Sequence, residues 1–462
     1  MLEGLNLVLD TFGANVFVPL VIFVVAKILK VTTKKAAFSA MSAAVGLMGF
    51  TMLIGAYGPI ITPIIEGMVT NAGVQLPTFD IGWPATSVIA YSTELGILGV
   101  GIILGLQVVL FLLKVTNVFQ PTDLWNNYSL FCFGSMAYVL TGNFWIGLIV
   151  MIVMMLYTQV FSEMIQKRWS TYYKYPNCVL ASLHTVSIAP FAIGMDYVLN
   201  KFGLYKIKAD PASLKSKIGL MGEPMFLGLF LGLGIGIIGN INALGELATW
   251  GTIVQAGIAT SAVMSVFPKV SGIFSGAFTA LTDASRKTIS GMGSDREWYL
   301  SVNDATGYGE TATLLSGLLL MPIVLILAFI LPGNSVLPLI DLVAIPYCIQ
   351  PIVACSNGNV VKTIVSGTLW FALALYAGTF LAPAFTEVAL AAGVDIGVGT
   401  ATMITSFCIV CQPVATLILY PFITANYVLM ALVIVVLVVL RVGMYKFKPV
   451  LHDHLEQQAS LE

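Results

Sequence analysis

The sequence predicts an all-α polytopic membrane protein with about 11 transmembrane helices and additional re-entrant hairpins. Hydrophobic residues make up 58% of the 462-residue chain and charged residues only 9%, whereas a soluble domain is usually about a quarter charged. The 21 Lys and Arg residues form short clusters, and none occurs in residues 36–113, 218–268, 297–361 or 363–440. A bilayer produces this pattern, because it excludes charge from apolar runs of about 20 residues.

The apolar runs give the order and direction of the spans. The first run follows Glu3 and Asp10 and ends among lysines, so the positive-inside rule predicts an outside N-terminus. An odd number of crossings then places the basic C-terminus in the cytoplasm. The expected spans are residues 14–33, 36–56, 95–113, 124–141, 144–165, 222–243, 247–267, 305–331, 336–355, 363–382 and 418–440.

Residues 175–200 do not fit this scheme. They are largely apolar and connect two basic clusters that should lie on the same side, yet they are too few for two crossings. A re-entrant hairpin resolves the conflict, with Pro190 and Gly194 interrupting the helix. Non-helical backbone at membrane depth occurs only where it is buried in protein or lines a wet cavity. The hairpin contains His184, so we expect part of a transport pathway here.

The chain also resembles itself at an offset of roughly 320 residues. Interrupted segments at matching positions of an internal repeat are typical of transporters, and they tend to form the substrate site. We expect repeat copies at about 13–113 and 332–440. The matched pairs are Asn15 with Asn334, Pro19 with Pro338, Lys35 with Lys362, Pro63 with Pro383, and Asp80-Ile-Gly with Asp395-Ile-Gly.

Ionisable and polar residues at the edges of these spans are the candidate substrate contacts, because such groups need a partner or a wet cavity. Asp123, next to Asn126, either caps a helix or binds substrate. Glu223 lies in Gly-Glu-Pro before an apolar run, which is equally a helix-start signature. Two further candidates, Asp304 and Glu310, are separated by Gly307 and Gly309, which could bring the two carboxylates together; the alternative is a solvated loop.

Trp83 and Ser87 complete the set, since an aromatic ring beside hydroxyl groups suits a polyol; Trp83 is alternatively an interfacial residue. The candidates are acidic, amide, hydroxyl and aromatic side chains and His184, without an intramembrane Lys or Arg to hold an anion. This chemistry favours a neutral polyhydroxyl ligand. There is no phosphate-binding loop of the GxxxxGK[ST] form, no basic stripe for nucleic acid, and no metal-ligand spacing around Cys408 and Cys411. We therefore expect no cofactor and no metal.

Six stretches, in order along almost the whole chain, resemble the membrane-embedded EIIC component of the bacterial phosphotransferase system, of the galactitol family. The match differs at Glu310, where the family often has another polar residue, frequently His. The stretches are FDIGWPATS (79–87), TDLWNNYS (122–129), HTVSIAP from His184, GEPMFLG (222–228), LPGNSVLP (331–338) with Asp341, and GNVVKTIVSG (358–367).

This resemblance implies one transport domain, residues 1–448, followed by a polar tail, 449–462, that we expect to be disordered. It implies a homodimer in the bacterial inner membrane, in contact with lipid, that moves a galactitol-like polyol by an elevator mechanism. EIIA and EIIB would be its partners, with the EIIB cysteine donating the phosphoryl group and no phospho-intermediate on this chain. His184, Glu223 and Asp304 are then the candidate proton acceptors.

Two alternatives stay open. The chain could be an ion-coupled secondary transporter in which Asp304, Glu310 and Glu223 relay protons, or a scaffold that does not transport.

Overall fold

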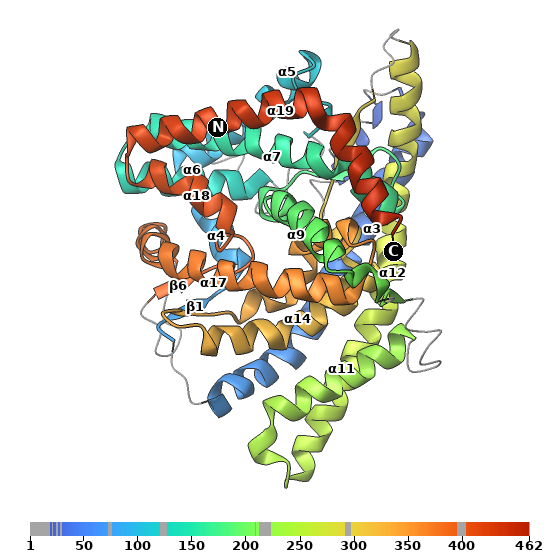
Figure 1. The fold of residues 1–462 in the computed structure, drawn as a ribbon, viewed down its shortest axis with the longest axis vertical. Coiled ribbons are helices and arrows are strands. Elements are labelled where there is room, and N and C mark those ends of the chain that lie inside the picture. The colour runs from blue at the N-terminus through green and yellow to red at the C-terminus, as the bar shows by residue number, and fades with distance from the viewer. Residues whose placement is uncertain are drawn as a thin grey trace.

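The computed structural model describes residues 19–20, 22–24, 26–27, 30–72, 76–120, 127–207, 209–211, 223–291, 297–394 and 403–461. Helices dominate it (Figure 1). Within these ranges, six helices are long and apolar enough to cross a bilayer, as expected for a multi-pass membrane protein. They are α5 (Glu94–Leu112), α7 (Phe144–Tyr173), α12 (Leu247–Gly291, apolar over Leu247–Val266), α14 (Thr311–Ile330), α17 (Val360–Ala391) and α19 (Tyr427–Ala459).

The remaining helices are mostly shorter than a bilayer requires. The 40-residue α3 is the exception and covers the expected span 36–56, whereas the expected span 14–33 is described only in part. These helices are α3 (Thr33–Ala72), α4 (Trp83–Tyr91), α6 (Tyr128–Thr141), α8 (Leu183–Val186), α9 (Ala189–Lys201), η2 (Leu204–Lys206), α11 (Pro224–Gly239), η4 (Ile241–Ala243), α13 (Ala305–Tyr308), η5 (Ile340–Ala344), α15 (Ile345–Cys348), α16 (Gln350–Cys355) and α18 (Pro413–Ile423).

The continuous span expected at 336–355 is wrong. The structure has a strand followed by η5, α15 and α16 in this interval. Pro346 and Pro351 each lie in the first turn of a new short helix, where a missing N–H costs nothing but a preceding helix cannot continue. The chain is therefore broken at three points within a stretch whose composition alone predicts a helix.

The described part of the chain also contains six short strands, which the sequence did not predict and which form two three-stranded parallel sheets. The first has the order β5–β1–β6 and the second the order β2–β4–β3. The strands are β1 (Thr78–Asp80), β2 (Val118–Phe119), β3 (Cys178–Leu180), β4 (Tyr299–Val302), β5 (Val336–Leu337) and β6 (Met403–Thr405).

The element order repeats once along the chain. A long helix, α3 or α12, precedes a strand, a short helix, a membrane-length helix, a second strand, a further long helix and a third strand. Each half supplies the central strand of one sheet and both outer strands of the other. Two halves related by a two-fold axis produce this exchange, which is common in transporters. The repeat of copies 13–113 and 332–440 stays a prediction.

The helices form two groups. Helices α3, α11 and α12 pack mainly on one another, and the second group contains α4 to α9 and α13 to α19. In Figure 1, α12 runs along one side of the molecule, across the direction of α14 and α17. The helices that follow the strands of both sheets belong to the second group, whereas β1 and β4 are each preceded by a helix of the first group.

The C-terminal tail is helical, so the expected disorder is wrong. Helix α19 continues to Ala459, with Pro449 inside it, and it bends before its end (Figure 1), as a helix does at an internal proline. Beyond the bend its polar side chains contact the second group of helices: Nε2 of His452 lies 2.8 Å from the carbonyl oxygen of Glu163, and Glu456 lies 2.7 Å from Arg168. The polar side chains of the tail therefore bond to residues that are distant in the sequence.

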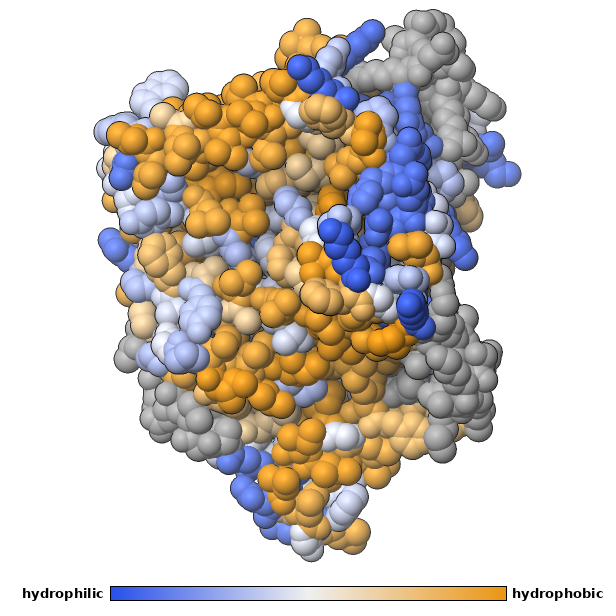
Figure 2. Space-filling model, in the orientation of Figure 1, coloured by the Kyte–Doolittle hydropathy of each residue, from blue (hydrophilic) through white to orange (hydrophobic). Residues whose placement is uncertain are grey.

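Most of the visible surface is apolar, and hydrophilic residues gather along one side (Figure 2). Helix α19 contributes a row of exposed apolar side chains, and only 17% of its most apolar window is buried within the chain. In water such a patch would drive association, whereas in a membrane protein it is the surface that faces lipid or a second membrane helix.

Candidate functional site

The carboxyl ends of β3 and β4 bring His184 and Asp304 together. The two strands are parallel, with Leu180 opposite Val302, so the segments that follow them leave the sheet at the same end. Helix α8 after β3 carries His184, and Asp304 precedes α13 after β4. Nε2 of His184 consequently lies 3.0 Å from Oδ2 of Asp304. Two residues that are 120 positions apart in the sequence form a direct contact.

This pair is buried but keeps one unused polar atom. His184 is 4% exposed and Asp304 6% exposed. Nδ1 of His184 is buried without a hydrogen-bond partner among the described residues, although a buried polar atom of this kind is costly unless something bonds it. The ring of Tyr128 lies 6.0 Å from the imidazole, and the Tyr128 hydroxyl bonds to Thr86. A ligand hydroxyl group is a chemically suitable partner for Nδ1.

Gln350 supports the backbone that carries Asp304. Its Nε2 donates to the carbonyl oxygen of Asp304 at 2.5 Å, and its Oε1 accepts from the indole N–H of Trp169 at 3.3 Å. A Cβ on Gly307 would collide with the Gln350 amide, so the glycine lets α13 approach α16 closely enough for this bond. The sequence drew attention to Gly307 as a helix breaker, but not to Gln350.

At the end of the other sheet, two buried carboxylates hold three chain segments together. Asp80 is the last residue of β1, and Asp341 lies in η5 after β5; they are 1% and 0% exposed. Both carboxylates accept from segments other than their own, so each fixes the backbone around the other. Asp80 accepts from the N–H groups of Gly82, Leu339, Asp341 and Phe407, and Asp341 accepts from those of Trp83 and Cys408 and from the Ser406 hydroxyl.

Gly82→Ala is expected to destabilise this junction by about 1–2 kcal/mol. Gly82 has φ +79°, and a Cβ there would lie 2.6 Å from Cγ2 of Ile340, so the substitution adds both backbone strain and a collision. Thermal unfolding of the detergent-solubilised protein measures the change. The matched control is Gly101→Ala, because Gly101 lies in helix α5 with nothing within 4 Å of its added Cβ. An equal or smaller loss for Gly82→Ala would contradict the structural requirement.

Gln412 connects the two sheet ends. Its Oε1 accepts from the Ser187 hydroxyl at 3.3 Å, next to the His184 segment, and its Nε2 donates to the carbonyl oxygen of Cys408 at 2.6 Å. Gln412 therefore bonds the segments after β3 and β6 to each other. We call the hydrogen-bonded side chains at these two sheet ends the polar layer; they are His184, Ser187, Asp304, Gln350 and Gln412. The described residues that bond to one another in this layer do not include Lys or Arg, and no described group of three His, Cys, Asp or Glu could hold a metal ion.

The structure describes four other candidates from the sequence only in part. Trp83 begins α4, and its side chain is 44% exposed; its backbone N–H donates to Asp341. Ser87 lies on the same helix, but its side chain is outside the described part. Asp123 and Asn126 also lie outside the described residues, although they follow β2, the third strand of the sheet that positions His184 and Asp304. Substrate contact by these four residues stays a prediction.

The structure does not bring the two remaining carboxylates to His184. Glu310 caps helix α14, and its two oxygens accept from the N–H groups of Ala312 and Thr313. Asp304 and Glu310 therefore begin successive helices, α13 and α14. Glu223 precedes α11, which packs mainly on α3 and α12. A role for either residue in substrate binding stays a prediction.

Comparison of the sequence with known proteins finds similarity to permease components. The family model of the sugar-specific permease component of the phosphotransferase system (EIIC-GAT) matches residues 8–399. The galactitol-specific EIIC component of Escherichia coli strain K12 is 25% identical over 392 residues, which cover 85% of each chain. A putative permease IIC component of the same strain is 27% identical over 384 residues, or 83% of this chain and 86% of that protein.

Proposed function

This chain belongs to the family of sugar-specific permease components (EIIC-GAT) of the phosphotransferase system, and on that premise we propose that it transports a sugar alcohol of the galactitol type. Its relatives include galactitol-specific components, which supports this substrate class. The observation that carries the proposal is the buried His184–Asp304 pair with its unpartnered Nδ1. It offers a neutral ligand both a charged acceptor and a further ring nitrogen.

The polar layer suits a polyol better than an anion. A sugar alcohol presents several hydroxyl groups, each a donor and an acceptor, and the layer supplies carboxylate, imidazole, amide and hydroxyl groups. One substrate hydroxyl would donate to Asp304 while a second bonds Nδ1 of His184. The residues after β2, including Asp123 and Asn126, would extend the same site.

Phosphorylation by EIIB would take place while the polyol is bound. As the oxygen of the substrate hydroxyl forms its bond to phosphorus, the bond between phosphorus and the EIIB cysteine sulfur breaks. The hydroxyl proton passes to Asp304, which His184 holds in position, in the way of a general base. His184 and Glu223 are the other proposed proton acceptors. No phosphoryl group is transferred to this chain.

We place the chain in the bacterial inner membrane as a homodimer in contact with lipid, with the N-terminus outside and the C-terminus in the cytoplasm, where EIIB and EIIA act. The division of the helices into two groups supports an elevator motion, because the second group holds every residue of the His184–Asp304 site and could move as a unit against α3, α11 and α12.

Uptake is expected to stop when the EIIB cysteine is replaced by serine, and wild-type cells should accumulate the phosphorylated polyol. Radiolabelled galactitol, followed by separation of free and phosphorylated products, measures both. Persistent uptake of unphosphorylated polyol without the EIIB cysteine would refute the coupling. An ion-coupled transporter, the alternative reading, would instead lose uptake on addition of a protonophore while phosphoenolpyruvate is abundant.

A further inference from the structure

A separate cavity of about 390 Å³ lies where helices α7 and α19 meet the segment that follows α5. It brings together the isolated Lys114 and residues from two basic clusters of the sequence, and it does not include any residue of the His184–Asp304 site. The lining residues are Lys114, Val115, Asn117, Glu163, Gln166, Lys167, Glu297, Arg441, Tyr445, Lys448, Pro449, His452 and Asp453.

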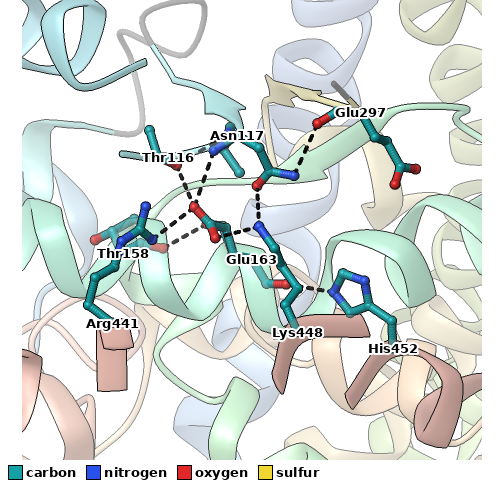
Figure 3. A network of polar contacts seen from close by, with 10 residues as sticks. Thr116, Asn117, Thr158, Glu163, Glu297, Arg441, Lys448 and His452 are labelled. Atoms are coloured by element: carbon teal, nitrogen blue, oxygen red, sulfur yellow. Dashed lines mark hydrogen bonds and ion pairs between the residues drawn. The ribbon is translucent and has the colours of Figure 1, made fainter. Parts of the chain in front are cut away.

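A buried carboxylate arranges the cations of this cavity (Figure 3). The Glu163 side chain is only 3% exposed, and it lies 2.9 Å from Nη1 of Arg441 and 2.8 Å from Nζ of Lys448. It also accepts from the Thr116 hydroxyl at 2.7 Å. Arg441 and Lys448 each remain 24% exposed. Glu163 therefore holds both cations in position, and each keeps N–H groups available to the cavity.

The cavity has an excess of positive charge. Its lining contains four cations, Lys114, Lys167, Arg441 and Lys448, against the three carboxylates of Glu163, Glu297 and Asp453. Lys167 pairs with Asp453 at 3.2 Å. Lys114 lines the cavity, and its ammonium group has no hydrogen-bond or ion-pair partner among the described residues. A singly charged anion would balance the site.

Apolar surface flanks this positive site on both sides. Val109, Leu112 and Leu113 near the end of α5 are exposed, as are Val438 and Val442 on α19. Tyr445, at the cavity, is 89% exposed, and exposed tyrosines of membrane proteins concentrate at the level of the lipid headgroups. A bilayer would cover this apolar surface and keep a soluble partner from it. A positive site beside lipid-facing apolar side chains therefore suits a lipid, which has a charged headgroup and apolar chains.

We propose that this cavity binds the phosphodiester headgroup of an anionic phospholipid, whose acyl chains lie along α5 and α19. Basic pockets between membrane helices on the cytoplasmic side are suited to such headgroups. The headgroup phosphate would accept from Lys114 and from the free N–H groups of Arg441 and Lys448. Bound there, the lipid would connect the end of α5 to α19.

Lys114→Asn is expected to weaken binding of phosphatidylglycerol about fivefold, which is the typical contribution of one basic residue at a membrane surface. Native mass spectrometry of the full-length protein, titrated with phosphatidylglycerol or phosphatidylcholine, measures it. Asn suits the site because Lys114 has φ 62°, a conformation that Asn tolerates. The matched control is Lys174→Asn: Lys174 has φ 61° and also ends a helix, but it does not line the cavity.

Selective retention of phosphatidylglycerol by wild type and by Lys174→Asn, with loss in Lys114→Asn, would support the proposal. Arg441→Gln should show a similar loss, and Arg441→Lys a smaller one. Equal binding of both lipids, or equal losses in the two lysine variants, would overturn it. So would displacement of the lipid by inorganic phosphate at matched concentration, which would identify a site for free phosphate, or a loss of EIIB binding without a change in lipid binding.

Discussion

Asp304→Asn is expected to weaken polyol binding by about 10- to 100-fold, the contribution of a charge-assisted hydrogen bond to a buried group, and to abolish phosphorylation-coupled uptake. The amide keeps the shape of the carboxylate but loses the charge that holds His184 at 3.0 Å and cannot accept the substrate proton. His184→Ala should cause a comparable loss of affinity, because it removes Nδ1 and leaves Asp304 without its imidazole partner. Isothermal titration with galactitol measures both variants.

The matched control is Asp453→Asn. Asp453 is likewise a carboxylate with a nitrogen partner, Lys167 at 3.2 Å, but its side chain is 67% exposed, so little effect on binding is expected. Size-exclusion chromatography should show that all three variants stay folded and assembled. Wild-type affinity in Asp304→Asn or His184→Ala would exclude the pair from the substrate site.

Asp196→Asn is expected to destabilise the protein by about 3–5 kcal/mol, because it leaves a buried ammonium group without its counter-ion. Lys362 is 0% exposed, and its Nζ lies 2.6 Å from Asp196 and 2.7 Å from Oδ1 of Asn200. The pair holds α17 against α9, which follows the His184 segment. Thermal unfolding in detergent, followed by light scattering, measures the loss.

Two further variants test the cause. Asp196→Leu combined with Lys362→Met removes both charges and should recover much of the lost stability, since desolvation of a buried pair opposes its attraction. Lys201→Met changes an exposed lysine on α9 and should have little effect. If the double variant were as unstable as Asp196→Asn, packing rather than charge would explain the loss.

Hydrophobic runs and charge clusters predicted several membrane spans, because a bilayer requires about 20 apolar residues in each span whatever the rest of the chain does. The expected span 95–113 coincides closely with α5, the span 144–165 with the first part of α7, and the span 247–267 with the apolar part of α12. The interval 175–200 forms β3, α8 and α9, none of which is long enough to cross a bilayer. His184 and Asp304 were selected separately as costly buried polar groups, and the structure shows them in contact.

What the sequence did not predict depends on partners far away in the chain. Strands of two to four residues have no periodicity of their own, and their pairings join segments such as β1 and β6. Asp80 stood out in the internal repeat, but its structural partner is Asp341, not the matched Asp395, which lies outside the described residues. The polar tail continues helix α19 and contacts Glu163, Arg168 and Asn200, all of which are distant in the sequence.

The exchange of strands between the two halves also affects how this protein is synthesised. Strand β1 leaves the ribosome early, but both of its neighbours, β5 and β6, belong to the last third of the chain. The first half can therefore enter the membrane long before its sheet can form. The Asp80 carboxylate can accept from the N–H groups of Leu339 and Phe407 only after those residues have been synthesised. Long-range pairing of this kind makes folding slow and exposes intermediates. Two separately expressed halves should accordingly acquire their native sheets only when they are produced together.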